Sequence, residues 1–557
     1  RVGGRKGSKV SGGDLRKRPE IVQGHYARLF ENAPELSSTL GNLVFTGDED
    51  DPETIETLSG MGFRQPREVT AAIRAWHFGR YAATRSTVAR ERLTELTPVL
   101  LSAIAETDNA DAAFLAFDRL VSKLPAGVQL FSLLVSNPRL LSLLTEIMGA
   151  APKLSETISR RPRVLDAVME PAFFDLVPDE ADLDRRLAES LAEARDYEEA
   201  LDLARIFGQE QIFLVGVRVL TGTLSAAQAG SAYATLAQVV VRHLLRVVED
   251  ELAKTHGRVR GGVCAVVALG KLGGREMTAS SDLDLMLLYD FDPECDASDG
   301  AKSLAPSQYY IRLTQRLVAA LSAPTAQGLL YEVDFRLRPS GNKGPMATRL
   351  AAFRTYHAEE AWTWEHMALT RARVVAGDPG FAAIVEQAIR DVLVAPRDPE
   401  KLRADVVEMR ELIEQEKGTK DPWDIKQVAG GLVDVEFVTQ YLMLRHAPEA
   451  PAVLATNTLA GIAALAAAGL LDTTTAEVLA PAMRLYQGLT QALRMASDGA
   501  FVPKQAPRGL IDLLTRIGEL PDFAHLEAHL VETENAAHLV YETVLGKPRK
   551  KKGGAPA

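Results

Sequence analysis

The apolar residues of this chain follow a helical spacing over most of its length, and one region breaks that spacing. Apolar side chains recur every three or four residues from about 21 to 205, and the same spacing returns after about 390 and continues to about 545. Between these stretches lie three short runs with the composition or alternation of strands, at 263–270, 282–290 and 329–338. The sequence therefore predicts a mainly α protein with one embedded α/β domain.

This pattern divides the chain into five segments. Residues 1–20 and 546–557 are basic, Gly-rich tails that cannot bury enough apolar surface to fold. Between them we expect a helical linker domain at 21–205, the α/β domain at 206–390 and a C-terminal helical bundle at 391–545. Prolines at 98, 125, 138, 152 and 162 are expected to divide the linker domain into short helices. The first residue is Arg1, so we expect the sequence to begin inside a longer protein or after a processing step.

Composition excludes several classes of protein. A net charge of -11 and a pI of 5.6 disfavour a general nucleic-acid binder, which needs clustered Lys and Arg. The two cysteines, Cys264 and Cys295, cannot build a disulfide framework or a Cys-based zinc site, which fits a reducing, cytoplasmic setting. No stretch approaches the roughly 18 apolar residues of a membrane helix. A protein or small-molecule partner is favoured.

Carboxylates alternate with apolar residues on the second strand candidate. Side chains two apart on a strand point to the same face, so Asp282 and Asp284 project together while Leu283 and Leu285 point into the core. Two adjacent carboxylates repel each other unless a positive charge lies between them. Hard oxygen ligands, with water and phosphate completing the shell, indicate a magnesium ion.

The third strand candidate carries charges of both signs. Its alternation places four charged side chains on one face, namely Glu332, Asp334, Arg336 and Arg338. We expect Asp334 to be the third metal ligand. A face with both charges suits phosphoryl transfer, in which a metal holds the phosphates and cations neutralise them.

A glycine-rich segment, Gly270-Lys271-Leu272-Gly273-Gly274, lies between the first two strands. Glycine lets backbone N–H groups approach a phosphate closely, but the Gly-Lys-Ser/Thr ending of a Walker A loop is missing. The order is strand, Gly-Gly, a segment ending in Ser280-Ser281, Asp-x-Asp on a strand and a third acidic strand. This ordered set resembles the nucleotidyltransferase superfamily built on the DNA polymerase β palm.

The resemblance assigns roles to these residues. Asp282, Asp284 and Asp334 would hold two Mg²⁺ ions on the triphosphate, and Asp334 would also assist deprotonation of the attacking hydroxyl. The nucleotide would be bound by Lys271, Gly273, Gly274, Ser281, Arg336 and Arg338. Two interpretations stay open for the basic residues. All three could contact the leaving phosphates. Alternatively, Arg336 and Arg338 could form structural ion pairs, and Lys271 could be a solvated loop residue.

Longer runs carry a closer resemblance. They are ALGKLGGRE (268–276), SSDLDL (280–285), YEVDFRLRPSG (331–341), AWTWEHMALTRAR (361–373) and GGLVDVEF (430–437), with NLVF (42–45), WHFGR (76–80) and LPAGVQLFSL (124–133) upstream. Together they look like glutamine synthetase adenylyltransferase, over about residues 21–545. In the last run, Asp434 and Glu436 are expected to be structural or to lie at a domain interface.

The resemblance implies a function. Family members carry two nucleotidyltransferase domains, one that removes AMP from glutamine synthetase by phosphorolysis and one that attaches AMP from ATP. This chain has a single Gly-Gly…Asp-x-Asp signature, and its Ala-Trp-Thr-Trp-Glu run is similar to the adenylylating half. The implied donor is ATP, the acceptor is a tyrosine hydroxyl of glutamine synthetase, and the regulators are a PII-type protein and glutamine.

Three alternatives stay open. The same fold could remove AMP by phosphorolysis, or the chain could be a non-catalytic module that binds glutamine synthetase or PII. RNA nucleotidyl transfer is disfavoured by the acidic balance.

Overall fold

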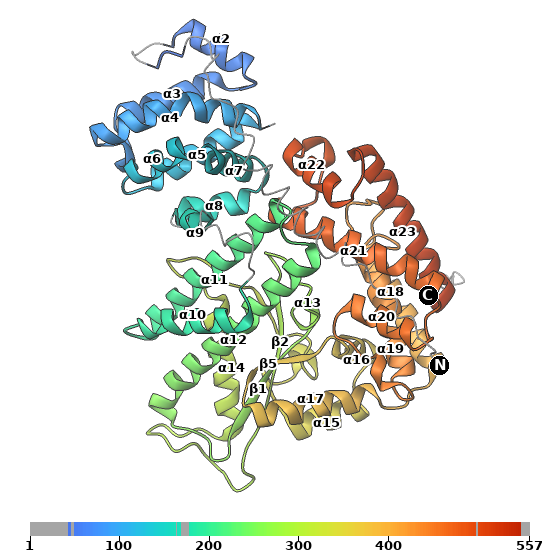
Figure 1. The fold of residues 1–557 in the computed structure, drawn as a ribbon. Coiled ribbons are helices and arrows are strands. Elements are labelled where there is room, and N and C mark those ends of the chain that lie inside the picture. Colours follow the sequence, from blue (N-terminus) through green and yellow to red (C-terminus); the bar gives the residue numbers. More distant parts are fainter. Residues whose placement is uncertain are drawn as a thin grey trace, which may run out of the picture. The chain divides into compact units, whose positions relative to one another are not determined.

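The computed structural model describes residues 43–45, 50–107, 109–162, 164–168, 178–496 and 499–546. The tail expected at 1–20, and all but residue 546 of the tail expected at 546–557, lie outside these residues. The described chain forms two compact units (Figure 1). Residues up to 168 together with Pro507–Gly509 make the first unit, and the remaining described residues make the second.

The first unit is helical, as the apolar spacing predicts. Its elements are α2 Pro52–Gly60, α3 Pro66–His77, the 3₁₀ turn η1 Ala82–Thr84, α4 Thr87–Ala105, α5 Ala110–Lys123, α6 Val128–Ser136, α7 Pro138–Ala150, α8 Pro152–Arg160 and α9 Val164–Val168. The fully buried Trp76 stacks on Phe114 with ring centroids 5.3 Å apart, and its indole N–H donates to Asp118 Oδ1 at 2.7 Å. An aromatic centre with its polar atom satisfied therefore holds α3 against α5.

Proline does not always mark a helix boundary here. Pro138 and Pro152 begin α7 and α8, as expected, but Pro98 lies inside α4. The flanking apolar residues Leu93, Leu96, Leu100 and Leu101 are fully buried. Packing of this apolar face continues the helix through a residue that lacks one backbone donor.

The second unit contains the mixed sheet. Its strands are β1 Val263–Ala268, β2 Leu283–Asp290, β3 Val333–Asp334, β4 Ala347–Arg349 and β5 Arg373–Gly377. β1 pairs antiparallel with β2 and β5, whereas β2 pairs parallel with β3 near its start and with β4 near its end. The apolar residues of β1 and β2 are buried, as a near-continuous apolar composition predicts.

The third strand is much shorter than the alternation over 329–338 predicts. β3 ends at Asp334 because the chain turns there, and the Arg336 N–H donates to Asp334 Oδ1 at 2.8 Å. Ser340, a few residues on, has a left-handed backbone with φ of 61°. The expectation that Arg336 and Arg338 share a strand face with Asp334 is therefore wrong, because a side chain on the strand itself ends the pairing.

Helices surround the sheet (Figure 1). They are α10 Glu180–Ala192, α11 Tyr197–Leu220, α12 Ala226–His256, α13 Gly270–Gly273, α14 Pro306–Ser322, α15 Leu350–Glu359, α16 Thr363–Leu369 and α17 Pro379–Leu393, with a 3₁₀ turn η3 Gly341–Lys343. The long α12 begins at a capping box of Ser225 and Gln228, and it packs against α11, α14 and β5. Helix α11 runs through the expected boundary at residue 205, so residues before it belong to the same unit as the sheet.

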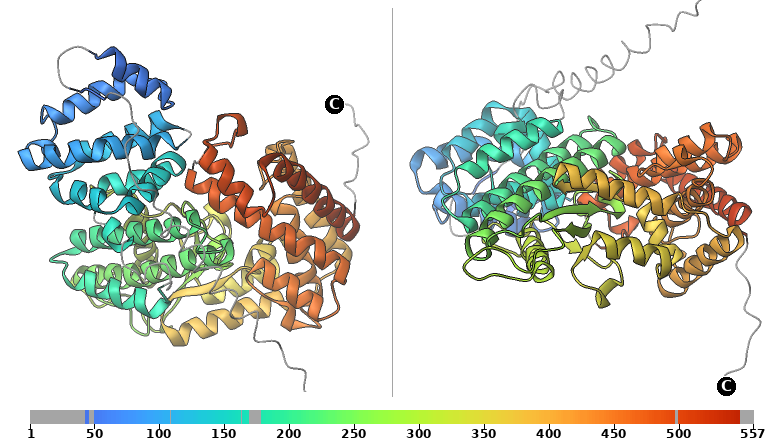
Figure 2. Two further views of the ribbon diagram at one scale, coloured as in Figure 1. Left: turned by 45° about the horizontal axis from the view of Figure 1, so that its top comes forward. Right: turned by 90° about the horizontal axis from the view of Figure 1, so that it is seen from below.

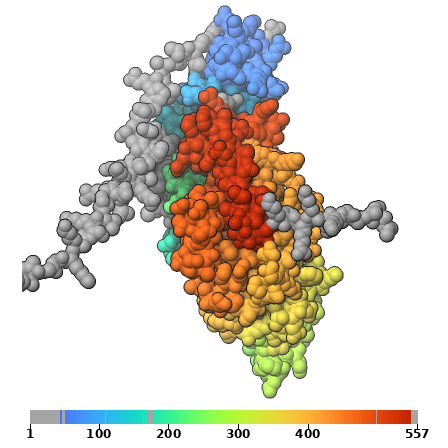
Figure 3. Space-filling model, turned by 90° about the vertical axis from the view of Figure 1, so that its right-hand side faces the viewer, coloured from blue at the N-terminus to red at the C-terminus, as the bar shows by residue number. Residues whose placement is uncertain are grey.

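The C-terminal helices form the expected bundle. They are α18 Pro399–Lys417, α19 Leu432–His446, α20 Thr458–Ala467, α21 Thr473–Ala496, α22 Arg508–Ile517 and α23 Phe523–Leu545, with 3₁₀ turns η4 Pro451–Val453 and η5 Pro503–Gln505. Figure 2 shows the bundle, orange to red, packed beside the green-to-yellow residues of the sheet region. On the face in Figure 3 its surface continues into the yellow residues of α15–α17.

Among the described residues no single helix is long and apolar enough to cross a membrane. Helices α6 and α7 pass such a test of length and composition only as a pair, and they meet at 109°.

Candidate functional site

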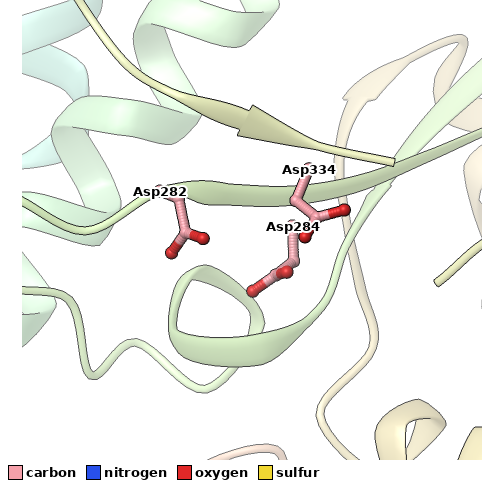
Figure 4. Close-up of side chains that lie close together, drawn as sticks. All are labelled: Asp282, Asp284 and Asp334. Carbon is pink, nitrogen blue, oxygen red and sulfur yellow. The ribbon is translucent and has the colours of Figure 1, made fainter. Parts of the chain in front are cut away.

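Three aspartates meet at one edge of the sheet. Asp284 on β2 and Asp334 on β3 are directly paired in the parallel register, and Asp282 immediately precedes β2. Each offers a carboxylate oxygen such that all three oxygens lie within 4.8 Å of one another. Figure 4 shows the three side chains on the same side of the strands. The structure thus brings together the three residues that the strand alternation selects.

Gly270 lies in close contact with the central aspartate, Asp284. Its backbone has φ of 51°, and a Cβ there would lie 2.0 Å from Asp284 Oδ2. The next turn is tied to the same residue, because Leu269 N donates to Asp284 O at 2.9 Å. Any side chain at position 270 would therefore displace the central carboxylate.

The three carboxylates have different electrostatic surroundings. Burial, followed by the charges of Asp282 and Asp334, raises the pKa of Asp284 to about 6. Burial also acts to raise the pKa of Asp334, but hydrogen bonds from Arg336 outweigh it and the pKa is lowered. The exposed Arg336 guanidinium donates to both Asp334 oxygens, through Nε at 2.8 Å and 3.1 Å and Nη2 at 2.5 Å. Asp334 is thus paired with an arginine, whereas Asp284 makes no ion pair with any residue that the structure describes.

A divalent cation would fit this arrangement. The donors are carboxylate oxygens, which are the ligands that Mg²⁺ and Mn²⁺ prefer. Two of them lie on the adjacent strands β2 and β3, and the third immediately precedes β2. Such a cation would also offset both causes of the raised pKa of Asp284, which are burial and the charges of Asp282 and Asp334. The open side of the cluster leaves coordination positions for water and phosphate, since Asp282 is exposed.

The Gly-Gly pair packs against Arg371. A Cβ at Gly273 would lie 1.9 Å from the Arg371 carbonyl oxygen, and a Cβ at Gly274 would lie 2.5 Å from Arg371 Nη2. Glycine is required here by close protein packing, whatever the pair binds. Lys271 lies in the short helix α13 between Gly270 and this pair.

Arg371 joins the glycine segment to the C-terminal bundle. Its buried guanidinium pairs with Glu276, which follows the Gly-Gly pair, and with Glu436 of α19 at 2.7 Å. Burial acts to lower the pKa of Arg371, but the two carboxylates outweigh it and raise the pKa, so the charge is kept. We call these three residues the Arg371 clasp.

Hydrogen bonds extend the Arg371 clasp. Thr458 N donates to Glu276 Oε1 at 2.7 Å, and Asn457 Nδ2 donates to the Gly274 carbonyl at 3.0 Å. Gln491 Nε2 donates to the Met277 carbonyl at 2.7 Å. Three bundle helices, α19, α20 and α21, therefore hold the segment between β1 and the aspartates, which confirms the interface expected for Glu436.

Basic side chains lie around the same segment. The pKa of the half-buried Lys271 is lowered first by burial and then by the positive charge of Lys426, while Glu436 acts in the opposite direction. Lys426 and Arg371 also favour the ionised form of Asp284. Lys271 therefore lies within electrostatic reach of Lys426, Arg494 and Arg371 as well as of Glu436.

Ser281 and Arg338 make contacts within the fold. The buried Ser281 hydroxyl accepts from Thr278 N at 2.8 Å and bonds the Thr278 hydroxyl at 3.0 Å. The buried Arg338 guanidinium donates to the carbonyls of Phe335 at 2.6 Å, Pro345 at 3.0 Å and Gly344 at 3.3 Å. These bonds fix the turn before Asp282 and the loop after Asp334.

A second buried ion pair orders the bundle itself. Asp434 accepts from Arg410 Nε at 2.5 Å, from Gly430 N at 2.6 Å and from His538 Nδ1 at 3.0 Å. Burial acts to raise its pKa, but these donors lower it. The structural role expected for Asp434 is confirmed.

The sequence patterns miss the Arg371 clasp as a unit. Glu276, Arg371 and Glu436 come from three separate runs, and nothing local indicates that they meet. Each of the three has another charged residue within two positions, namely Arg275, Arg373 and Asp434, so no lone charge in an apolar run marks it. Asn457 and Thr458 carry no such signal either.

Two family models and several curated proteins are similar to this chain in sequence. Residues 141–388 match the family model described as Glutamate-ammonia ligase adenylyltransferase, and residues 403–500 match that described as GlnD PII-uridylyltransferase. Similar curated proteins are named bifunctional glutamine synthetase adenylyltransferase/adenylyl-removing enzyme. The one from Brucella melitensis is 51% identical over 529 residues, which cover 95% of this chain and 53% of the relative. The one from Rhizobium meliloti is 50% identical over 528 residues, covering 94% and 53% respectively. The chain thus spans about half the length of these relatives.

The raised pKa of Asp284 predicts a pH-dependent stability difference. Without metal, the folded protein favours protonated Asp284, with a pKa of about 6 against the usual 3.8, so the wild type loses stability as pH rises through this window. Asp284→Asn removes that loss. We expect the variant to match the wild type near pH 4 and to exceed it by about 1 to 3 kcal/mol at pH 7. Urea unfolding in EDTA at pH 4, 5, 6 and 7 measures this difference, and a difference that stays constant with pH would contradict the account.

The Arg371 clasp predicts a large cost for losing its cation. Arg371→Met leaves the buried Glu276 and the partly buried Glu436 without their cation, and we expect a loss of about 3 to 5 kcal/mol in urea unfolding. Adding Glu276→Gln and Glu436→Gln should restore part of this loss, because the uncompensated carboxylates cause it. The matched control is Arg185→Met, which removes an exposed arginine with two ion pairs of its own and should leave stability unchanged. Equal effects at positions 371 and 185 would refute the role of the clasp.

Proposed function

Because this chain belongs to the glutamine synthetase adenylyltransferase family, we propose that it transfers AMP from ATP to a tyrosine hydroxyl of glutamine synthetase and releases pyrophosphate. The observation that carries the proposal is the cluster of Asp282, Asp284 and Asp334, whose carboxylate oxygens lie within 4.8 Å of one another. Transfer of AMP to glutamine synthetase would down-regulate nitrogen assimilation. The Ala-Trp-Thr-Trp-Glu run at 361–365 favours the adenylylating half of the family.

The sheet would serve as a polymerase-β-like palm. Its support is the order of parts, in which β1, the glycine segment, the Asp-x-Asp strand and the third acidic strand follow one another and converge on the aspartates. Asp282, Asp284 and Asp334 would hold Mg²⁺. When bound, Mg²⁺ supplies positive charge that stabilises the negative charge developing on the α-phosphoryl group and on the leaving pyrophosphate.

Basic residues of the chain would bind the triphosphate. Lys271, in the short helix that begins at Gly270 beside Asp284, would neutralise phosphate charge. The exposed Arg336 guanidinium pairs with Asp334. If the Asp334 carboxylate instead bound a metal ion, this guanidinium would be free to contact the leaving phosphates. Arg338 has its donors committed to backbone carbonyls, so we assign it the structural role.

The protein residues would also orient the reacting groups. Gly270, Gly273 and Gly274 keep the segment beside Asp284 free of side chains, so its backbone N–H groups could face a phosphate. Asp334 lies opposite Asp284 and would accept the proton of the attacking tyrosine hydroxyl. The buried Ser281 would hold the turn that presents Asp282.

The cellular location and the regulators of the chain are part of the same proposal. A cytoplasmic location is favoured by two buried free cysteines, Cys264 and Cys295. A PII-type protein and glutamine would regulate the transfer through the bundle. The match of residues 403–500 to a family described as GlnD PII-uridylyltransferase supports a regulatory use of this part of the chain.

Phosphorolytic removal of AMP is the second candidate. The similar relatives are named both adenylyltransferase and adenylyl-removing enzyme, and this chain spans about half of their length. In this reaction the same aspartates would act, with phosphate as the attacking group. A non-catalytic module that binds glutamine synthetase is the third, and it would have no use for the aspartate cluster.

Aspartate substitutions separate these functions. With ATP labelled on the α-phosphate, the wild type should transfer label to glutamine synthetase, and Asp284→Asn or Asp334→Asn should lower the rate by about 10³-fold. The matched control is Asp290→Asn at the far end of β2, which pairs with Arg349 and should keep activity.

Loss of AMP from pre-labelled synthetase, with no forward transfer, would instead assign the removing activity. Full activity in Asp284→Asn would refute the site, and binding of the synthetase with neither reaction would favour the non-catalytic module.

A further inference from the structure

A polar cavity lies at the opposite end of the sheet from the aspartates. It has a volume of about 370 Å³ and is lined by Val263, where β1 starts, and by Gly377, where β5 ends. Val263 pairs with Asp290, six residues along β2 from Asp284, which corresponds to about 20 Å of strand. A molecule in this cavity would therefore not touch the aspartate cluster.

Two buried tyrosines form one wall of this cavity. Tyr309 and Tyr310 are 5% and 4% exposed, and within the described part of the chain neither hydroxyl has a hydrogen-bond partner. The Tyr310 ring stacks on Tyr289 with centroids 4.3 Å apart and meets Tyr309 edge-on at 5.4 Å. Ring packing thus fixes two hydroxyl groups that make no hydrogen bond to the described residues and are available to a ligand in the cavity.

An acid and a thiol lie on the same lining. Cys264 Sγ donates to Glu249 Oε1 at 3.4 Å, and across the described residues this is the one hydrogen bond of the Glu249 carboxyl. Burial raises the pKa of Glu249, which indicates that the carboxyl is poorly solvated. The second carboxyl oxygen is available to a ligand.

Arginines surround the opening. Arg242 is held by Glu180 and Asp184, and Arg258 pairs with Asp250 at 2.8 Å. Arg246 also lines the cavity, is exposed and makes no ion pair with any residue that the structure describes. Its guanidinium can therefore form a bidentate pair with an oxyanion at little cost, with Arg258 beside it.

We propose that this cavity is a binding site for a small organic oxyanion, a molecule with a carboxylate or phosphate group held by Arg246 and Arg258 and a polar body hydrogen-bonded to Tyr309, Tyr310 and Glu249. The volume lies in the range of small-molecule sites. The hydroxyls and the unpaired guanidinium offer a ligand two different kinds of polar contact in one cavity. The site is independent of the function proposed for the aspartates.

Calorimetric titration of the whole chain tests this proposal. The probes are inorganic phosphate, glycerol 3-phosphate and succinate, with glycerol as the neutral control, and the first two distinguish a phosphate from the carboxylate source in succinate. At least one oxyanion should bind where glycerol does not. Arg246→Ala should weaken that binding by about tenfold or more, and Tyr310→Phe, which keeps the ring stack, should weaken it measurably.

Two matched variants complete the test. Arg260→Ala removes an exposed arginine that pairs with Asp292 and does not line the cavity, so it should bind the probe as the wild type does. Asp284→Asn should also bind normally, because the aspartate cluster is remote. The proposal is overturned if none of the three oxyanions binds, if Arg246→Ala and Arg260→Ala bind equally, or if Asp284→Asn abolishes binding.

Discussion

The repulsion among three carboxylates at one sheet edge is the constraint on which the rest of the second unit depends. Pairing β2 with β3 in parallel places Asp284 beside Asp334, and Asp282 follows from the strand alternation. This arrangement is unfavourable for the ionised Asp284, whose pKa is raised first by burial and then by the charges of Asp282 and Asp334. The buried apolar residues of β1 and β2 must hold the strands together against it. A cation bound between the carboxylates would offset this cost, which is why we propose the cluster as a metal site.

The surrounding structure fixes this cluster from two sides. Arg336 pairs with Asp334 on the exposed side, and Gly270 lets the backbone pass directly under Asp284. On the buried side the Arg371 clasp ties the glycine segment to the bundle, so that the bundle helices become part of the site. A buried ion pair contributes little net stability but specifies which surfaces meet. This account explains why a helical bundle far along the chain positions residues of a small sheet.

Much of the site could be predicted from the sequence because it depends on local periodicity. The alternation around Asp282 and Asp284 requires only that the segment be a strand, and the apolar composition of β2 indicates that. The length of β3 could not be predicted, because the Asp334 side chain itself forms the turn that ends the strand. The contacts of Arg338 and the Arg371 clasp could not be predicted from the sequence either, because each depends on groups that only the complete fold brings together.

The central claim is that the aspartate cluster binds divalent cations together with a nucleotide. Electron paramagnetic resonance of Mn²⁺, titrated into the protein with a non-hydrolysable ATP analogue, measures this directly because free and bound Mn²⁺ give different signals. The account predicts about two bound ions per chain in the wild type, and weaker or fewer ions in Asp284→Asn, with Asp290→Asn behaving as the wild type. Equal binding in the wild type and Asp284→Asn would contradict it.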